Sequence, residues 1–302
     1  MTHCGINCRQ GALCPRFHRQ QMSILSYHIV NVFTRGGDLF SGNPLCVIED
    51  GRGLDTQQMQ SLARQFNLSE TSFILPSQRA SARVRIFTPT FEMPFAGHPT
   101  LGTAHVCRIL GLGGDALTLE MQAGIIPVQA QGRSWTLEAN APTWREVEPP
   151  TLVAHLLGLG PGDIAGRPMW VNAGKEQLVI PLVDAQAVRR ASMRPEVLRN
   201  FASQDGINMA YVFAPEGPGR FVARFFFGAA GSGVLEDPAT GSAAANFGGW
   251  WLAMDRPVPA AMEIFQGEQV QRPSTLHVHI DAGRRIFVSG EVLEIGRGTV
   301  SL

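Results

Sequence analysis

The sequence predicts an α+β protein built from two similar strand-rich halves, each surrounding a buried helix. Three observations support this fold class: strand-forming runs predominate, two helical segments are apolar on every face, and two stretches of sequence recur in the same order. The chain has 302 residues, of which 44% are apolar and 17% are charged. This is enough for two domains with hydrophobic cores.

Short runs of β-branched and aromatic residues recur between turn residues, as is typical of strands. The clearest runs are 27–33, 45–48, 72–75 and 84–87. Helical periodicity is convincing at 56–66, where apolar residues fall three and four apart. Two further helical segments, 100–110 and 242–254, carry almost no charge. Because they are apolar on all faces, we expect each to be buried on all sides as the core helix of one half.

An internal repeat identifies the two halves. The segment 67–76 (NLSETSFILP) aligns without gaps on 206–215 (GINMAYVFAP), and 92–98 (EMPFAGH) aligns on 236–242 (EDPATGS). The second copies begin 139 and 144 residues after the first. Two matches in the same order at nearly the same offset favour a duplicated fold over the alternative, chance similarity of turn-rich segments.

We expect the first half-domain at 26–140 and the second at 141–284, joined near the prolines of 138–150. The extension 1–25 is expected to be disordered. It has no continuous apolar segment of the kind found in secretory signals, which favours a cytoplasmic protein.

Charge and cysteine content exclude several functions. Lys plus Arg equal Asp plus Glu at 25 each, so no overall field attracts nucleic acid or an anionic membrane. The apolar stretches are too short and glycine-rich to span a bilayer.

Five cysteines, three of them in the extension, argue against a disulfide framework. The extension also lacks the paired Cys-x-x-Cys spacing of zinc sites, so no metal is expected.

Both repeats place Pro-x-x-Gly before an apolar helix, followed by His98 in one copy and Ser242 in the other. Free backbone N–H groups and the positive end of the helix dipole gather at such a start. Two such starts facing each other would bind an anionic substrate, most simply a carboxylate. The alternative is that each motif is only a helix-start turn, with Ser242 as a cap.

The two copies differ at two polar positions: Glu70 corresponds to Met209, and Asp237 corresponds to Met93. Partial burial of Glu70 at a strand end would raise the pKa of its carboxyl, which could then remove and return a proton. Asp237 could bind an amino or hydroxyl group of the substrate.

His98, at a helix start, would be a neutral hydrogen-bond donor, because the dipole disfavours the imidazolium. Each of these residues also has an ordinary interpretation: Glu70 as a solvated or capping residue, Asp237 as a turn former before proline, and His98 as a structural residue. No cofactor-binding motif occurs, so we expect direct proton chemistry without a cofactor.

Several segments together resemble the PhzF-like family of phenazine-biosynthesis proteins. They are 40–44 (FSGNP), 67–71 (NLSET), 85–89 (RIFTP), 92–100 (EMPFAGHPT), 236–244 (EDPATGSAA) and 266–274 (QGEQVQRPS). The resemblance runs from about Tyr27 to the C-terminus and implies the diaminopimelate-epimerase-like fold: two β-barrel-like halves, each around a central helix, with the active site between them. It also implies a homodimer, and a last strand at 285–302 that returns to the first half.

Racemases of this superfamily use two cysteines at the turns that here read 94–97 and 238–241, and neither turn contains cysteine. The resemblance instead implies Glu70 as the single acid/base, with Asp237 and His98 as assisting polar groups. The residues it implies for substrate binding are Gly97, Gly241 and Ser242.

We therefore expect a cofactor-independent isomerase that moves a proton within a small cyclic or amino-acid-like carboxylate. In the branch that the sequence resembles, the phenazine enzyme isomerises trans-2,3-dihydro-3-hydroxyanthranilate; the resemblance does not fix the substrate of this chain. Two alternatives are a non-catalytic ligand-binding dimer of the same fold and an amino-acid racemase or epimerase.

Overall fold

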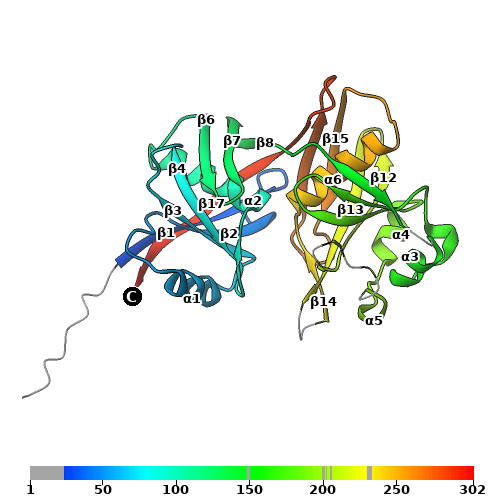
Figure 1. Cartoon of the computed structure of the whole chain (residues 1–302), viewed down its shortest axis with the longest axis horizontal. Coiled ribbons are helices and arrows are strands. Elements are labelled where there is room, and N and C mark those ends of the chain that lie inside the picture. The colour runs from blue at the N-terminus through cyan, green and yellow to red at the C-terminus, as the bar shows by residue number, and fades with distance from the viewer. Residues whose placement is uncertain (1–23, 148–149, 199–200, 202, 205, 230–232) are drawn as a thin grey trace, which may run out of the picture.

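The computed structural model describes residues 24–147, 150–198, 201, 203–204, 206–229 and 233–302. The expectations for the N-terminal extension, including its cysteines, concern residues that lie outside this description except for Ile24 and Leu25. Figure 1 shows two strand-rich halves side by side.

The first half is a closed ring of eight strands, in which the last strand pairs with the first. A closed ring leaves no free strand edge. In order around the ring the strands are β1 (Ile24–Val32), β2 (Asn43–Ile48), β3 (Glu70–Leu75), β4 (Ala82–Phe87), β6 (Ala116–Met121), β7 (Gly124–Gln131), β8 (Ser134–Glu138) and β17 (Ile286–Ser301). The short β5 (Glu92–Met93) pairs with β4.

The second half repeats this order of strands in an incomplete ring, because no pairing between β9 and β17 is found among the described residues. Its strands are β9 (Thr143–Glu146), β10 (Met169–Asn172), β11 (Glu176–Pro181), β12 (Met209–Gly217), β13 (Arg220–Ala229), β15 (Ala260–Gln266), β16 (Ser274–Ile280) and the first residues of β17. Here β14 (Gly233–Asp237) pairs with β13 as β5 pairs with β4. The strands thus repeat element by element, in agreement with the sequence repeat.

Strand β17 belongs to both rings. Residues 286–289 pair with β16 of the second half, and residues 292–301 pair with β1 of the first. In Figure 1 this strand runs from one half across to the other. The domain boundaries 26–140 and 141–284 stay a prediction.

Each ring contains one apolar helix, α2 (Gly97–Ile109) or α6 (Gly241–Ala253), and ten residues of each helix are buried. This confirms the expectation for the two uncharged segments. Helix α2 begins three residues earlier than expected, because Pro99 is tolerated in a first helical turn, where its missing N–H is not needed. One hydrophobic cluster includes residues of both rings, so the halves share a core.

Shorter helices cover the outside. Helix α1 (Thr56–Phe66) packs on Cys46 and Ile48 of β2, whereas Leu45 and Val47 of the same strand belong to the cluster around α2, as the two-residue period of a strand requires. The others cover the second half: α3 (Pro150–Leu156), η1 (Pro161–Asp163), α4 (Ala185–Arg190) and α5 (Pro195–Leu198).

Both ends of α1 are fixed by its sequence. Asp55 and Gln58 form a reciprocal capping box at its start. At its end Asn67 adopts the left-handed conformation (φ 52°), which Asn tolerates better than most residues. The chain therefore turns sharply and starts β3 at Glu70.

The repeat extends to a pair of bidentate ion pairs. Arg85 of β4 holds Glu92 of β5 at 2.7 and 2.6 Å, and Arg224 of β13 holds Glu236 of β14 at 3.0 and 2.7 Å. The two arginines lie 139 residues apart, at the offset of the sequence repeat. Each ion pair links the two strands of the hairpin that precedes a core helix.

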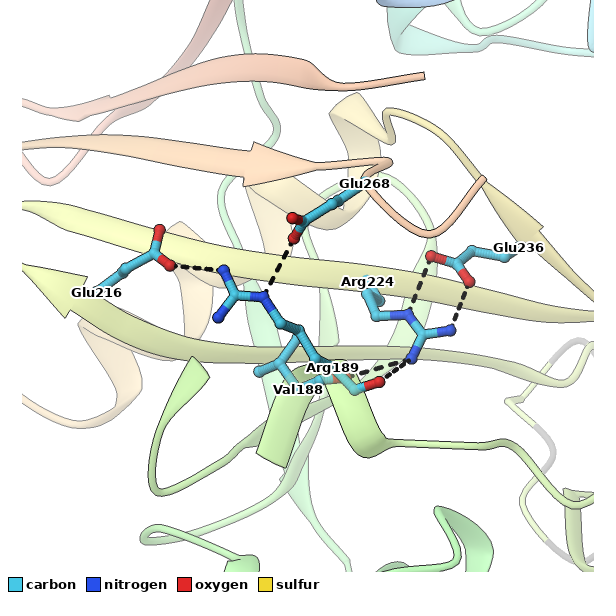
Figure 2. Close-up of polar contacts among 6 residues, drawn as sticks. All are labelled: Val188, Arg189, Glu216, Arg224, Glu236 and Glu268. Atoms are coloured by element: carbon cyan, nitrogen blue, oxygen red, sulfur yellow. Dashed lines mark hydrogen bonds and ion pairs between the residues drawn. The ribbon is translucent and has the colours of Figure 1, made fainter. Parts of the chain in front are cut away.

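Arg224 has a further role. Its Nη1 donates to the carbonyl oxygens of Val188, Arg189 and Ala191 at the end of α4, and Figure 2 shows it between α4 and Glu236. Among the described residues Arg85 donates to no carbonyl at a helix C-terminus; its Nη2 instead donates to the hydroxyl of Thr56, the first residue of α1.

We predict that Arg224→Lys lowers the free energy of unfolding by about 2–3 kcal/mol, and that Arg85→Lys lowers it by about 1 kcal/mol. Lysine cannot make the bidentate contact in either case, but only the first change also removes donors from the end of α4. Denaturant unfolding of both variants checks this, and equal losses would contradict it.

Candidate active site

The two core helices meet at their N-termini. A Cβ atom built on Gly97 would lie 3.6 Å from the Cα of Gly241, an ordinary van der Waals distance, so the backbones of the two helix starts lie close together. The N-cap residues, Ala96 and Thr240, make no side-chain capping bond to their helices. Two positive helix ends therefore face each other, which is an environment suited to an anion.

Glu70 lies beside this junction. It is the first residue of β3, and its Oε2 is 3.1 Å from Nε2 of His98, the second residue of α2. The Glu70 side chain is 15% exposed and that of His98 is 7% exposed. Burial, with a smaller contribution from the negative charge of Asp237, raises the pKa of Glu70 to about 8.

Burial lowers the pKa of His98 to about 3, although a hydrogen bond from its ring to the carbonyl of Pro44 acts in the opposite direction. Nε2 lies near Glu70 Oε2, but neither atom has a hydrogen-bond partner among the described residues, so we assign the donor of the bond to Pro44 to Nδ1. At neutral pH both groups are then uncharged, and the carboxylic acid of Glu70 can direct its proton to the lone pair on Nε2. The contact is a neutral acid–imidazole pair and not an ion pair.

Asp237, the last residue of β14, approaches from the second half. Its Oδ1 accepts a hydrogen bond from Asn43 Nδ2 at 2.9 Å, and its Oδ2 accepts one from the hydroxyl of Thr240. Burial raises the pKa of Asp237 to about 6, while these two hydrogen bonds act to lower it. The carboxylate is therefore ionised at neutral pH, when Glu70 is mostly protonated.

Ser242 is held by a polar network within the second half. Gln177 Nε2 donates to the Ser242 hydroxyl at 2.9 Å, and Gln177 Oε1 accepts from Asn246 of α6. Asn246 Oδ1 in turn accepts from the backbone N–H of Ala173. The serine hydroxyl is thus oriented from β11 and does not cap its own helix.

All six residues singled out in the sequence lie around the junction of α2 and α6. The structure adds partners that the sequence reasoning missed. They are Asn43, Gln177, Thr240, Asn246 and Gln266. Asn43 and Gln266 lie in segments that carry the family resemblance, whereas Gln177 and Asn246 had no such signal.

A separate cavity of about 160 Å³ is lined by residues of the second half and by Arg35 of the first, which stacks on Phe265; Glu70, His98 and Asp237 do not line it. Its walls include Arg189, which donates to Glu216 and Glu268 (Figure 2), and Arg224, which is paired with Glu236. The charged groups drawn there are paired with one another, so the cavity does not compete with the junction as the place for proton chemistry.

Comparison with known proteins decides the family. The profile described as "Phenazine biosynthesis-like protein" matches residues 30–296. The chain belongs to this family.

Several of its relatives are named as isomerases. The chain is 38% identical to an uncharacterized isomerase of Pasteurella multocida, with 90% of this chain and 93% of the relative covered. It is 34% identical to the trans-2,3-dihydro-3-hydroxyanthranilate isomerase of Pseudomonas aeruginosa, with 91% and 99% covered. The protein is accordingly an isomerase-type enzyme of the phenazine biosynthesis-like family.

Solved structures give the same fold. A PhzF-family protein of Bacillus anthracis superposes with a TM-score of 0.80 at 25% identity, covering 92% of this chain and 99% of that one. A hydroxyproline epimerase from Agrobacterium vitis superposes with a TM-score of 0.62 at 14% identity, covering 92% and 93%, and shows likeness of fold alone. The diaminopimelate-epimerase-like fold is thus confirmed. Among the described residues, no helix combines the length and apolar character needed to cross a membrane.

The raised pKa of Glu70 makes stability depend on pH. Its pKa is about 8 in the fold and 4.5 as the model value for an unperturbed glutamate, so the folded state binds the proton more tightly. The contribution of Glu70 to stability is then full below about pH 4.5 and is lost as pH rises to about 8.

We predict that Glu70→Gln, which has no ionisable group, becomes more stable relative to the wild type over this range. The gain should exceed about 1.4 kcal/mol, the equivalent of one pH unit in a pKa. Unfolding curves at several pH values measure it, and a constant difference between the two proteins would refute the assignment.

Proposed function

We propose that the protein is a cofactor-independent isomerase that moves a proton within a small cyclic or amino-acid-like carboxylate, with Glu70 as the single acid/base. The observation that carries this proposal is the buried Glu70 carboxyl, with a pKa of about 8, at the junction of two helix N-termini. Such a group can both remove and return a proton near neutral pH.

The substrate carboxylate binds the backbone N–H groups at the starts of α2 and α6, where Gly97 and Gly241 leave space and Ser242 adds a hydroxyl. The ionised Asp237 accepts a hydrogen bond from an amino or hydroxyl group of the same substrate. These two contacts fix the orientation of the reacting carbon relative to Glu70.

Glu70, as the carboxylate, removes a proton from one carbon and returns it to another on the same face. Neutral His98 accepts a hydrogen bond from the protonated Glu70 and holds the acid in place between the two steps. Because one group carries the proton throughout, the transfer needs no second base.

The relatives support the reaction class and suggest the first substrate to test. The Pseudomonas aeruginosa relative is named for trans-2,3-dihydro-3-hydroxyanthranilate, a cyclic amino-acid-like carboxylate. A racemase is less well supported, because the turns 94–97 and 238–241 contain no cysteine. Isomerase relatives over nine tenths of the chain count against a non-catalytic binder. The homodimer and the cytoplasmic location stay predictions.

We predict that the protein isomerises trans-2,3-dihydro-3-hydroxyanthranilate and that Glu70→Gln lowers kcat at least about 100-fold, since the general acid–base is lost. The ultraviolet spectrum and the product mass in deuterated water are the measurements. Partial retention of the substrate hydrogen is expected for one shuttling group. Glu120→Gln, which changes a carboxylate paired with Arg79, serves as the control with unchanged turnover.

Turnover by Glu70→Gln at the wild-type rate would remove Glu70 from the mechanism. Absence of turnover by the folded wild type would redirect the search to other small carboxylates.

The pH dependence of kcat/KM follows from the two carboxyl groups. We predict that kcat/KM rises with pH through about pH 8 and levels off above it, because the reaction begins with the Glu70 carboxylate. Below about pH 6 the slope steepens, since Asp237 is then protonated as well. Initial rates from pH 5 to 9 test this, and a profile that is flat from pH 6 to 9 would rule it out.

A further inference from the structure

The segment 266–273, which joins β15 to β16 and which we call the strap, has so far been given no role. In the first half the matching connection, between β6 and β7, consists of residues 122–123, because Met121 already pairs with Gly124. In the second half Gln266 pairs with Ser274, which leaves residues 267–273 between the strands. The second half therefore has the longer connection.

The registers of the strands show what the strap replaces. Ala82 of β4 pairs with Leu119 of β6, and Phe221 of β13, 139 residues later, pairs with Ile264 of β15. Gln266 thus occupies the position of Met121. By the sequence repeat, Asp237 and Thr240 occupy the positions of Met93 and Ala96. Three polar residues of the second half stand where the first half has apolar ones.

These three residues are hydrogen-bonded to one another. Gln266, which is 2% exposed, donates from Nε2 to the carbonyl oxygen of Asp237 at 2.9 Å and to Oγ1 of Thr240 at 3.0 Å. A threonine hydroxyl has a single hydrogen. Because Thr240 Oγ1 accepts from Gln266, that hydrogen is directed to Oδ2 of Asp237. Gln266 therefore determines one of the two side-chain hydrogen bonds to the Asp237 carboxylate.

Residues at the other end of the strap form hydrogen bonds with the first half. Arg272 donates from Nε to the carbonyl of Gly42 at 2.8 Å and from Nη2 to Asn31 Oδ1 at 2.8 Å. The carbonyl of Pro273 accepts from the N–H of Gly42. These contacts fix the backbone immediately before Asn43, whose amide donates to Asp237 Oδ1. Arg272 therefore determines the placement of the second hydrogen bond to the carboxylate.

We propose that the strap is a positioning device for Asp237, in which Gln266 acts through Thr240 and Arg272 acts through Asn43. Its catalytic consequence rests on the proposed function, in which Asp237 orients the substrate for Glu70. By orienting both donors the strap favours the ionised carboxylate, against the burial of Asp237 and the charge of Glu236. The ionisable groups around Asp237 are Glu70 and His98 of the first half and Glu236, which is paired with Arg224.

The test is Gln266→Met, which introduces the residue found at the matching position of the first half. Methionine cannot donate to Thr240, so the pKa of Asp237 should rise by about one unit. The pKa can be measured without any substrate, from the unfolding free energies of each protein with and without Asp237→Asn. A buried carboxyl with a raised pKa makes the protein less stable as pH rises from the pKa of that group in the unfolded state to its pKa in the folded state.

For the wild type this loss, relative to Asp237→Asn, should run from about pH 4 to about pH 6. In the Gln266→Met background it should continue to about pH 7, one unit higher. The steepening of the pH profile of kcat/KM should move up by the same amount, so that kcat/KM falls about fivefold more at pH 6 than at pH 8.

Arg272→Lys is the second variant, because lysine cannot reach Gly42 and Asn31 in the same way, and it should shift both measurements in the same direction. Gln60→Met is the matched control. It removes a glutamine-to-carbonyl hydrogen bond to Thr88, remote from Asp237, and should leave both measurements unchanged.

Equal pH dependence of unfolding in wild type, Gln266→Met and Gln60→Met would overturn the proposal. A shift confined to Gln266→Met and Arg272→Lys would support it. The unfolding measurements need no substrate. If the protein turned over no carboxylate, the proposed function would be wrong, but the unfolding measurements would still test the role of the strap.

Discussion

The structure depends on the close approach of two helix N-termini at Gly97 and Gly241. Each helix touches the other at its N-terminus. The apolar side chains along the rest of the helix must therefore be buried by the strands of its own half. It also explains why α2 and α6 carry so few charged residues. The same constraint gathers backbone N–H groups at one place and creates an anion site before any side chain is added.

Side-chain chemistry then distinguishes the halves. The duplicated framework is symmetric in its strands, its core helices and the ion pairs of Arg85 and Arg224. The polar groups at the junction are not symmetric, because Glu70 comes from β3 of one half and Asp237 from β14 of the other. Their unlike surroundings give them unlike pKa values, about 8 and about 6. A symmetric scaffold therefore holds one neutral acid and one anion at neutral pH.

Much of this arrangement could be predicted from the sequence. The uncharged helices and the repeat identified the two halves, since each signal can be read from short continuous segments of sequence. The partners of Asp237 could not be predicted, because Asn43 is 194 residues away and Gln266 is 29 residues away, and nothing local indicates that they meet. Arg85 and Arg224 occupy matching positions of the repeat in the sequence. Their ion pairs with glutamates could not be predicted, because these depend on the pairing of β4 with β5 and of β13 with β14.

The sharing of β17 between the rings bears on how the chain is made. The first ring is closed by β17, which pairs with β8 and β1 and follows the whole of the second half in the sequence. During synthesis on the ribosome β1 and β8 therefore keep an unpaired edge until β17 has been added. The long sequence separation of this contact predicts slow folding, and exposed edges in the waiting intermediate are sites of misassociation. An N-terminal fragment covering only the first half would lack its closing strand.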